Sequence, residues 1–274
     1  MKGFVGSMKA IILAAGKGTR LRPLTYGIPK PLLPVKGKPV LDWVISNIVK
    51  CKEVDEIIVG ISGTSYGDED RKLAKIHGLC IDAYLKNSSY GIPIRTIQTP
   101  QLETAGDLKF IIRKGKIKET ILVAYGDNIT SINSNKMYEY HKKAKNKLGI
   151  QSTLALFPAH KKDLSRLGIA KTQKIHDIFI IENFIEKPTN PISNLANAGY
   201  YVLDPEIFDL IPGSKEKMEE SVFPQLVKKR MMAGFIEKLP FWLDIGTLES
   251  YELANTLAHK GLIIPPPKNS KVNK

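Results

Sequence analysis

Nearly continuous apolar runs alternate with amphipathic segments along the first 150 residues. The runs Lys9 to Ala14, Glu56 to Ile61 and Thr120 to Ala124 are typical of strands buried on both faces, and Ile92 to Ile97 adds a fourth strand. The predicted helices are Pro39 to Val49, with Pro39 at the first helical position, Arg71 to Leu85, Thr104 to Arg113, with Thr104 at the N-cap, and Asn135 to Lys147. This order predicts a parallel sheet with helices on both faces, a doubly wound α/β fold.

The pattern changes after about residue 150, where short strand candidates follow one another with few helices between them. These strands are Ser152 to Phe157, Leu167 to Thr172, Ile178 to Ile181, Phe184 to Ile185 and Gly199 to Leu203. Two final helices are predicted at Glu219 to Met232 and Leu248 to Lys260. We therefore expect a smaller, more antiparallel second half that continues the same sheet.

The domain boundaries follow from these patterns. Residues 1–7 precede a strand that starts at Met8, and we expect them to form a flexible extension. Residues 8–262 form a single domain whose halves meet near residue 150, and residues 263–274 form a disordered tail. No apolar run approaches the roughly 20 residues that cross a bilayer, and no hydrophobic signal core is present. We expect a soluble, cytoplasmic protein with no membrane partner.

The two cysteines, Cys51 and Cys80, lie in apolar-patterned segments, so we expect two buried thiols rather than a disulfide or a metal site. The chain has 41 Lys and Arg against 27 Asp and Glu, a formal charge of +14. Its cations are spread over several segments without an aromatic-interleaved stripe, which favours small polyanions over nucleic acid as partners.

A glycine-rich run, LAAGKGTRLRPLT from Leu13 to Thr25, directly follows the first predicted strand. It is not a Walker A loop, because Gly16 and Lys17 are followed by Gly18, and Leu21 stands where a dinucleotide fingerprint needs its third glycine. Small residues after a strand nevertheless let backbone N–H groups approach an anion. Arg20 and Lys30 could reach the same anion, so we predict a phosphate-binding turn.

The longer run from Ile12 to Leu41 resembles the signature of the sugar-1-phosphate nucleotidylyltransferases. The resemblance continues in order through LETAGDL (102–108), YGDN (125–128), IEKP (185–188), NAGYYVLDPEIF (197–208) and FWLDIGTLESY (241–251), and covers Met8 to about Lys260. It implies a Rossmann-like core that condenses a nucleoside triphosphate with a hexose-1-phosphate, giving a nucleotide sugar and pyrophosphate. These two substrates are the expected partners, with self-association into a homo-oligomer left open.

Residue roles follow from the family pattern, in a reaction that brings two polyanions together and therefore needs positive charge. The resemblance implies a catalytic set of Arg20, Lys30, Asp127 and Lys187. It implies nucleotide contacts for Leu13, Ala14, Ala15, Gly16, Gly18, Thr19, Gln98, Glu103, Thr104 and Gly126. For the sugar phosphate it implies Gly168, Glu186, Lys187 and Asn197, and for Mg²⁺ it implies Asp127 and Asp244.

One departure leaves the nucleotide base open. The family usually has glycine where Glu103 stands, and a carboxylate there could accept a hydrogen bond from a base or face the solvent. We expect UTP or dTTP with glucose-1-phosphate, partly from GDNI (126–129) and partly because no hexapeptide repeats follow residue 260. The alternative, a mannose-1-phosphate guanylyltransferase, rests on TAG (104–106) and LDIGTLESY (243–251).

Two further alternatives belong to other classes. A non-catalytic homologue with a regulatory role should have lost Arg20, Lys30, Asp127 or Asp244, yet all four are present. A basic nucleic-acid-binding protein should instead show steeply salt-dependent affinity for oligonucleotides.

Overall fold

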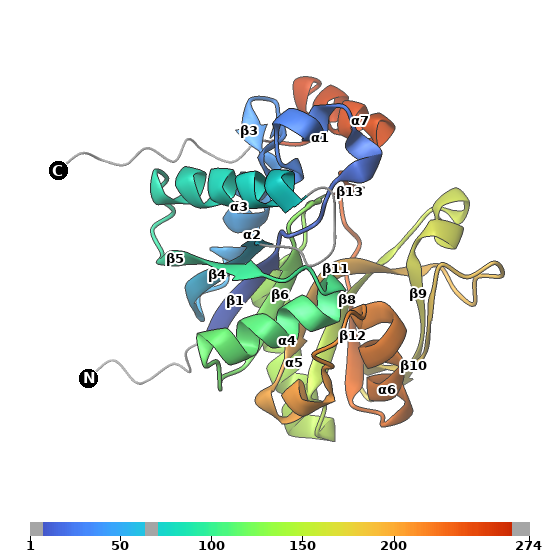
Figure 1. Ribbon diagram of the computed structural model, residues 1–274. Coiled ribbons are helices and arrows are strands. Elements are labelled where there is room, and N and C mark those ends of the chain that lie inside the picture. Colours follow the sequence, from blue (N-terminus) through green and yellow to red (C-terminus); the bar gives the residue numbers. More distant parts are fainter. Residues whose placement is uncertain (1–7, 64–70, 265–274) are drawn as a thin grey trace.

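The computed structural model describes residues 8–63 and 71–264, whose main feature is one nine-stranded sheet in the order β5-β4-β1-β6-β11-β8-β12-β10-β9 (Figure 1). The strands are β1 (Met8–Leu13), β4 (Val54–Ser62), β5 (Ile94–Thr99), β6 (Ile121–Tyr125), β8 (Ser152–Pro158), β9 (Gly168–Ile175), β10 (Ile178–Glu186), β11 (Leu195–Leu203) and β12 (Met232–Ile236). The first four pair in parallel, and β11 joins them to the second half by antiparallel pairing with β6 and β8. The predicted mixed α/β sheet is confirmed.

Helices cover both faces of this sheet (Figure 1). On one face lie α2 (Val40–Ile48), α3 (Arg71–Lys86) and α5 (Ser134–Leu148), and on the other lie α4 (Glu103–Gly115) and α6 (Phe223–Lys228). Alternate residues of each strand feed the two cores: Ile12 packs in the first and Ile11 in the second. Burial on both faces explains why the parallel strands are continuously apolar.

A smaller layer lies beyond the carboxyl ends of β1 and β6. It contains α1 (Leu24–Gly27), α7 (Leu248–His259) and two short antiparallel ladders, β2 (Pro34–Val35) with β3 (Lys38–Pro39) and β7 (Asn128–Thr130) with β13 (Trp242–Asp244). Val35, Ile129 and Ile245 are among the apolar residues that form its own core. Short 3₁₀ segments at Thr19–Leu21, Lys30–Leu32, Lys161–Arg166 and Pro205–Leu210, and a π-helical turn at Met218–Val222, complete the chain.

The structure corrects several predicted boundaries. The predicted helix 219–232 is wrong beyond Lys228, because Met232 begins strand β12, which pairs in parallel with β8. The predicted strands 178–181 and 184–185 are one strand, β10, with an irregularity between Ile181 and Asn183.

The predicted helix starts also shift by one or two residues. Pro39 is the N-cap of α2 rather than its first residue, and Leu102, not Thr104, is the N-cap of α4. The hydroxyl of Thr104 accepts a hydrogen bond from Met218 N at 2.9 Å, so it holds a distant segment instead of the helix end.

Two expectations about burial also change. Cys51 is buried as predicted, whereas Cys80 is exposed on α3. Ile263 is 1% exposed and packs in the small core, so the proposed tail does not begin there. The flexible extension 1–7 and the tail from residue 265 lie outside the described residues.

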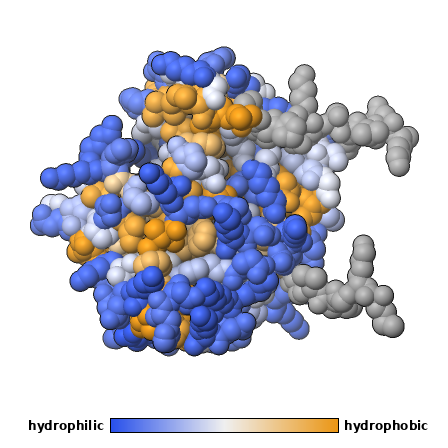
Figure 2. Space-filling view, turned by 180° about the vertical axis from the view of Figure 1, so that it is seen from behind, coloured by the Kyte–Doolittle hydropathy of each residue, from blue (hydrophilic) through white to orange (hydrophobic). Residues whose placement is uncertain are grey.

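Hydrophilic side chains dominate the face seen from behind, interrupted by apolar patches (Figure 2). In the described ranges, no helix is both long enough and apolar enough to cross a membrane.

A buried polar cluster joins α5 to the end of β11. The Thr120 hydroxyl donates to Asp204 Oδ1 at 2.6 Å, Lys145 Nζ lies 2.9 Å from Asp204 Oδ2, and His141 Nε2 lies 3.3 Å from the same oxygen. Burial alone would raise the pKa of Asp204, but these neighbours together hold the pKa below its usual value. The ionised carboxylate therefore stabilises the folded state.

Asp204→Asn is expected to lower the free energy of unfolding by about 1–3 kcal/mol at pH 7, because hydrogen bonds to a charged group are lost. Since the folded-state pKa is depressed, the wild-type contribution is present above the unfolded pKa and disappears as the pH falls below about 4. Urea unfolding between about pH 3 and pH 7 should give the variant a shallower acid dependence. Glu182→Gln, on an exposed residue of β10, is the control; equal acid dependence in wild type and Asp204→Asn would contradict the assignment.

Candidate active site

The glycine-rich segment forms a turn beyond the carboxyl end of β1. Gly18 has φ 64°, a left-handed conformation that glycine adopts without strain, and its carbonyl accepts a hydrogen bond from Thr25 Oγ1 at 2.8 Å. A Cβ at Gly18 would lie 3.0 Å from Thr25 Cγ2. Gly126 N donates to Leu13 O at 2.9 Å, which fixes the start of the turn against the end of β6. The turn is therefore held from both sides.

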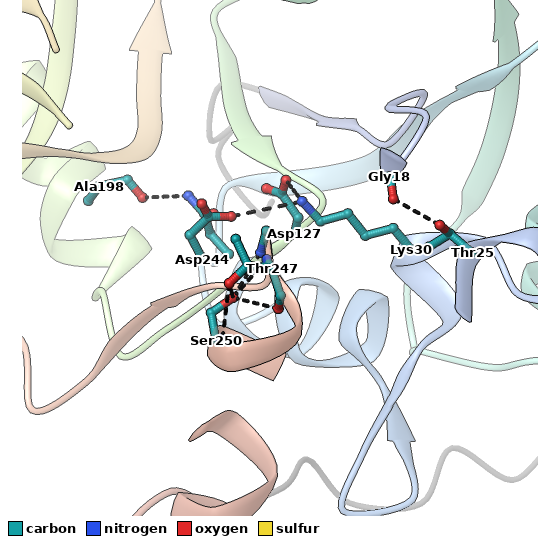
Figure 3. A network of polar contacts seen from close by, with 10 residues as sticks. Gly18, Thr25, Lys30, Asp127, Ala198, Asp244, Thr247 and Ser250 are labelled. Carbon is teal, nitrogen blue, oxygen red and sulfur yellow. Dashed lines mark hydrogen bonds and ion pairs between the residues drawn. The ribbon is translucent and has the colours of Figure 1, made fainter. Parts of the chain in front are cut away.

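Lys30 lies between two carboxylates (Figure 3). Its Nζ is 2.5 Å from Asp127 Oδ2 and 3.9 Å from Asp244 Oδ1, and its side chain is only 10% exposed. Burial raises the pKa of Asp244, and the negative charge of Asp127 raises this pKa further, while Lys30 and Arg20 oppose both effects. The site thus concentrates two negative charges around one ammonium group.

A short backbone ladder brings the two aspartates together. β7 pairs with β13 so that Asn128 is opposite Asp244, and Ile245 N donates to Asp127 O at 3.0 Å. A Cβ at Gly246 would lie 2.8 Å from Asp244 Oδ2 and 3.0 Å from Arg20 Nη2, so only glycine leaves room for both side chains. Residues far apart in the sequence are thereby fixed at one point.

The start of α7 anchors this turn through a capping box (Figure 3). Thr247 Oγ1 accepts a hydrogen bond from Ser250 N at 3.2 Å, and Ser250 Oγ accepts from Gly246 N at 3.1 Å and Thr247 N at 3.0 Å. The sequence TLES (247–250) satisfies the free N–H groups of the helix end immediately after Asp244.

A cleft of about 590 Å³ opens over these groups. Twelve of the predicted site residues line it, namely Leu13, Ala14, Ala15, Gly16, Gly18, Thr19, Arg20, Lys30, Glu103, Thr104, Gly126 and Asp127. Gln98 does not: it is exposed on β5 beside Gly63. The remaining lining residues are Lys17, Pro31, Gln101, Asp107, Tyr125, Lys215 and Gly246, which the sequence analysis did not assign to the site.

Two of these unassigned residues, Gln101 and Asp107, shape the wall at the start of α4. Gln101 Nε2 donates to Ala15 O at 2.9 Å and so ties this wall to the glycine-rich turn. Asp107 accepts hydrogen bonds from Thr99 Oγ1 and Leu102 N, each at 2.8 Å, and burial is the main cause that raises its pKa. Both residues lie within a few positions of predicted site residues. The sequence pattern does not show that their side chains face the cleft.

Lys215 lies on a loop that follows Glu103, at the start of α4, by more than a hundred residues in the sequence. This loop lies directly on α4, since a Cβ at Gly106 would be 2.3 Å from Ser214 O. Gly106 of the TAG motif (104–106) indicates that another segment packs closely on α4. The sequence does not show which segment this is.

The predicted sugar-phosphate residues lie outside the lining of this cleft. Glu186 is paired with Gly168 across β10 and β9, and a Cβ at Gly168 would lie 2.7 Å from Glu186 Oε2. Lys187 Nζ is 3.5 Å from Glu186 Oε1, with a side chain that is 60% exposed. Asn197 is buried on β11, where its Oδ1 accepts a hydrogen bond from Gly199 N at 2.8 Å.

Glu219 connects this second group to the cleft. Its carboxylate accepts hydrogen bonds from the Tyr125 hydroxyl and, at 3.3 Å, from Thr104 Oγ1, and both donors line the cleft. Burial raises the pKa of Glu186, and the negative charge of Glu219 raises this pKa further, against the opposing charge of Lys187. The two groups are therefore electrostatically coupled.

Asp127 and Asp244 are the residues suited to a metal ion. Over the described ranges, no group of three or more His, Cys, Asp or Glu side chains could hold one. Mg²⁺, however, is usually bound by one or two protein carboxylates and otherwise by phosphate oxygens and water. Two converging carboxylates beside the glycine-rich turn fit that requirement.

Comparisons with known proteins agree with the motifs. The model of the nucleotidyl transferase family matches residues 9–261. A protein of Sulfolobus acidocaldarius named "Putative mannose-1-phosphate guanyltransferase" is 32% identical over 96% of this chain and 68% of its own length. The mannose-1-phosphate guanyltransferase of Saccharomyces cerevisiae is 29% identical, over 95% of this chain and 67% of its own.

The fold also matches solved structures. A crystal structure of apo UDP-glucose pyrophosphorylase superposes with a TM-score of 0.71, covering 94% of this chain and 100% of that one, at 20% identity. This likeness confirms the fold class.

Thr247→Ala is expected to lower the free energy of unfolding by about 1 kcal/mol, because the N-cap hydrogen bond to Ser250 is lost. Thr256→Ala, at an exposed position inside the same helix, is the matched control and should be neutral or slightly stabilising, since alanine favours helix. Thermal or urea unfolding compares the two, and equal stabilities would show that the capping box does not hold this helix end.

Proposed function

Because the chain belongs to the nucleotidyl transferase family, we propose that it transfers a guanylyl group from GTP to mannose-1-phosphate, releasing pyrophosphate. The support is that curated relatives matching 95–96% of this chain are named mannose-1-phosphate guanyltransferases. The chain spans about two thirds of the length of these relatives, so the proposal concerns the part that they share.

The expectation of UTP or dTTP with glucose-1-phosphate gives way to the alternative from the sequence analysis. The neighbour named for UDP-glucose is 20% identical and carries the fold alone. The relatives named for mannose-1-phosphate are 29–32% identical along nearly the whole chain. Uridylyl or thymidylyl transfer is kept as the second candidate, to be separated by direct assay.

The observation that carries the proposal is that Arg20, Lys30 and Asp127 line one cleft, while Asp244, which does not line it, lies 3.9 Å from Lys30. In the reaction, an oxygen of the sugar phosphate forms a bond to the α-phosphorus of the triphosphate, and the bond from that phosphorus to the β-phosphate oxygen breaks. Both reactants are anions, so Arg20 and Lys30 lower the repulsion and hold the phosphates in line. No protein nucleophile or base is needed.

Asp127 and Asp244 would hold Mg²⁺. When bound, the ion supplies positive charge at the phosphate oxygens and helps to orient the triphosphate. The glycine-rich turn contributes backbone N–H groups to the same phosphates through the small residues Gly16 and Gly18.

Glu186 and Lys187 would bind the sugar phosphate. The Glu186 carboxylate accepts hydrogen bonds from sugar hydroxyls, and the exposed ammonium of Lys187 pairs with the phosphate of the sugar. Gly168 leaves space beside Glu186, and Asn197 adds an amide on the neighbouring strand. These two roles complete the proposed sugar site.

The central test is pyrophosphate release with GTP, UTP, dTTP and ATP, each combined with mannose-1-phosphate and glucose-1-phosphate, with and without Mg²⁺. GTP with mannose-1-phosphate and Mg²⁺ is expected to give the highest kcat/KM. Asp127→Asn and Asp244→Asn should each lower kcat by about a hundredfold or more, because a charged ligand of the ion is lost.

Asp177→Asn is the control for this test, since Asp177 forms ion pairs with Lys143 and Lys147 on the surface. Its turnover should equal that of the wild type. Unchanged rates in both Asp127→Asn and Asp244→Asn would overturn the metal assignment, and turnover with UTP but not GTP would overturn the choice of nucleotide.

A second prediction concerns pH. Because the pKa of Glu186 is raised, binding of the sugar phosphate should weaken as the pH falls through this raised pKa, where the carboxylate becomes protonated. Glu219→Gln removes one cause of the rise and should shift the acid limb of the KM profile for the sugar phosphate to lower pH. The substrate's own ionisation is the same for both proteins and cancels in the comparison. Superimposable profiles would contradict the coupling of Glu186 and Glu219.

A further inference from the structure

Glu103 holds a conformation that is costly for its residue type. It is the first residue of α4 and has φ 60°, a left-handed backbone that glycine adopts far more easily than glutamate. The backbone around it is fixed, because Ala105 N donates to Glu216 O at 2.9 Å and Glu216 N donates to Leu102 O at 3.2 Å. A strained residue in a cleft points to a role for its side chain.

The Glu103 side chain is exposed in the cleft and has no partner. The neighbouring carboxylates are occupied: Asp107 accepts two hydrogen bonds, and Glu219 accepts from Tyr125 and Thr104. For Glu103, the part of the chain that the structure describes provides neither a hydrogen bond nor an ion pair to the carboxylate. Its negative charge is therefore available to a ligand.

Lys215 lines the same cleft, and its charged group, like that of Glu103, has no partner in the described residues. Its ammonium group has no ion-pair or hydrogen-bond partner within residues 8–63 and 71–264. Its loop is held on α4 by the close contact of Ser214 O with Gly106 and by the backbone bonds of Glu216. One free carboxylate and one free ammonium group thus face one cleft, unpaired with each other.

The position of these charges relative to the phosphate site follows from the cleft itself. Lys30, Asp127 and Arg20 gather at the glycine-rich turn, and Gln101 links Ala15 of that turn to the wall that carries Glu103. A nucleoside triphosphate whose phosphates occupied the turn would extend its base along this wall, with Glu103 at an edge of the base.

Among the common bases, guanine alone presents two adjacent donors, N1–H and the 2-amino group, next to the acceptor O6. An ionised carboxylate accepts two hydrogen bonds side by side, and an ammonium group donates to O6. Uracil and thymine present one N–H group between two carbonyl oxygens. A carboxylate placed there would be repelled by these oxygens. Adenine presents an acceptor at N1 and an amino group where the ammonium would lie.

Resting on the function proposed above, we infer that Glu103 selects guanine by binding its N1–H and 2-amino groups, with Lys215 donating to O6. Glu103 is thus a specificity-determining residue, and the cost of its backbone conformation is offset when the base binds. The chemistry of phosphoryl transfer does not depend on it.

The test compares kcat/KM for GTP, ITP, UTP and ATP at saturating mannose-1-phosphate in the wild type, Glu103→Gln and Glu103→Gly. ITP carries hypoxanthine, which lacks the 2-amino group, and should be about tenfold poorer than GTP for the wild type. In both variants kcat/KM for GTP should fall about 10- to 100-fold, while kcat/KM for UTP and ATP should change less than about threefold. The gap between GTP and ITP should close. Glu103→Gly also relieves the backbone, so misfolding cannot explain a shared loss.

Glu216→Gln is the matched control, because Glu216 lies beside Glu103 in the backbone pairing but its carboxylate accepts a hydrogen bond from Ser214. It should keep the wild-type preference for GTP. Lys215→Met should lower GTP use without improving UTP use.

The outcomes separate this inference from the proposed function. If the wild type uses GTP and the Glu103 variants change all four triphosphates equally, or none, the role of Glu103 is refuted while the guanylyl transfer stands. If the wild type prefers UTP or dTTP, both are refuted. If no triphosphate is turned over, the proposed function fails, and calorimetric binding of GTP and ITP to the same variants still decides the role of Glu103.

Discussion

The site depends on the balance of charge around Lys30. Its ammonium group lies 2.5 Å from Asp127 and 3.9 Å from Asp244, in a place where its side chain is nearly buried. Neither the carboxylates nor the ammonium group is favourable there alone, because two converging carboxylates repel each other and a buried charge without a partner is costly. In the proposed reaction, a divalent cation and a triphosphate would give each of these charges a new opposite partner. One set of ion pairs would then be exchanged for another.

The fold makes this balance possible by ending several segments at one place. β1 and β6 are parallel neighbours, so the turn after β1 and Asp127 after β6 lie side by side beyond their carboxyl ends. The short ladder between β7 and β13 then brings Asp244 to the same point from the end of the chain. The main sheet supplies the platform, and the small outer layer supplies the last charge.

The sequence predicted what depends on local pattern. The continuous apolar run from Lys9 to Ala14 predicted a strand buried on both faces, and the small residues and cations after it predicted the turn. It missed what depends on distant partners. Residues 232–236 are apolar and follow a helix, and only parallel pairing with β8 makes them a strand. Lys215 reaches the cleft because its loop packs on Gly106. The sequence around Lys215 does not predict this contact.

The ladder between β7 and β13 also sets when the site comes into existence. Its two strands are separated by more than a hundred residues, and β13 lies near the end of the described chain. During synthesis the phosphate turn and the first aspartate leave the ribosome long before Asp244 does. A nascent chain can therefore assemble the parallel sheet around its glycine-rich turn while still lacking the second carboxylate. In the proposed reaction Asp244 helps to hold the metal ion, so a chain that stops before β13 would keep the glycine-rich turn and Asp127 without the second carboxylate.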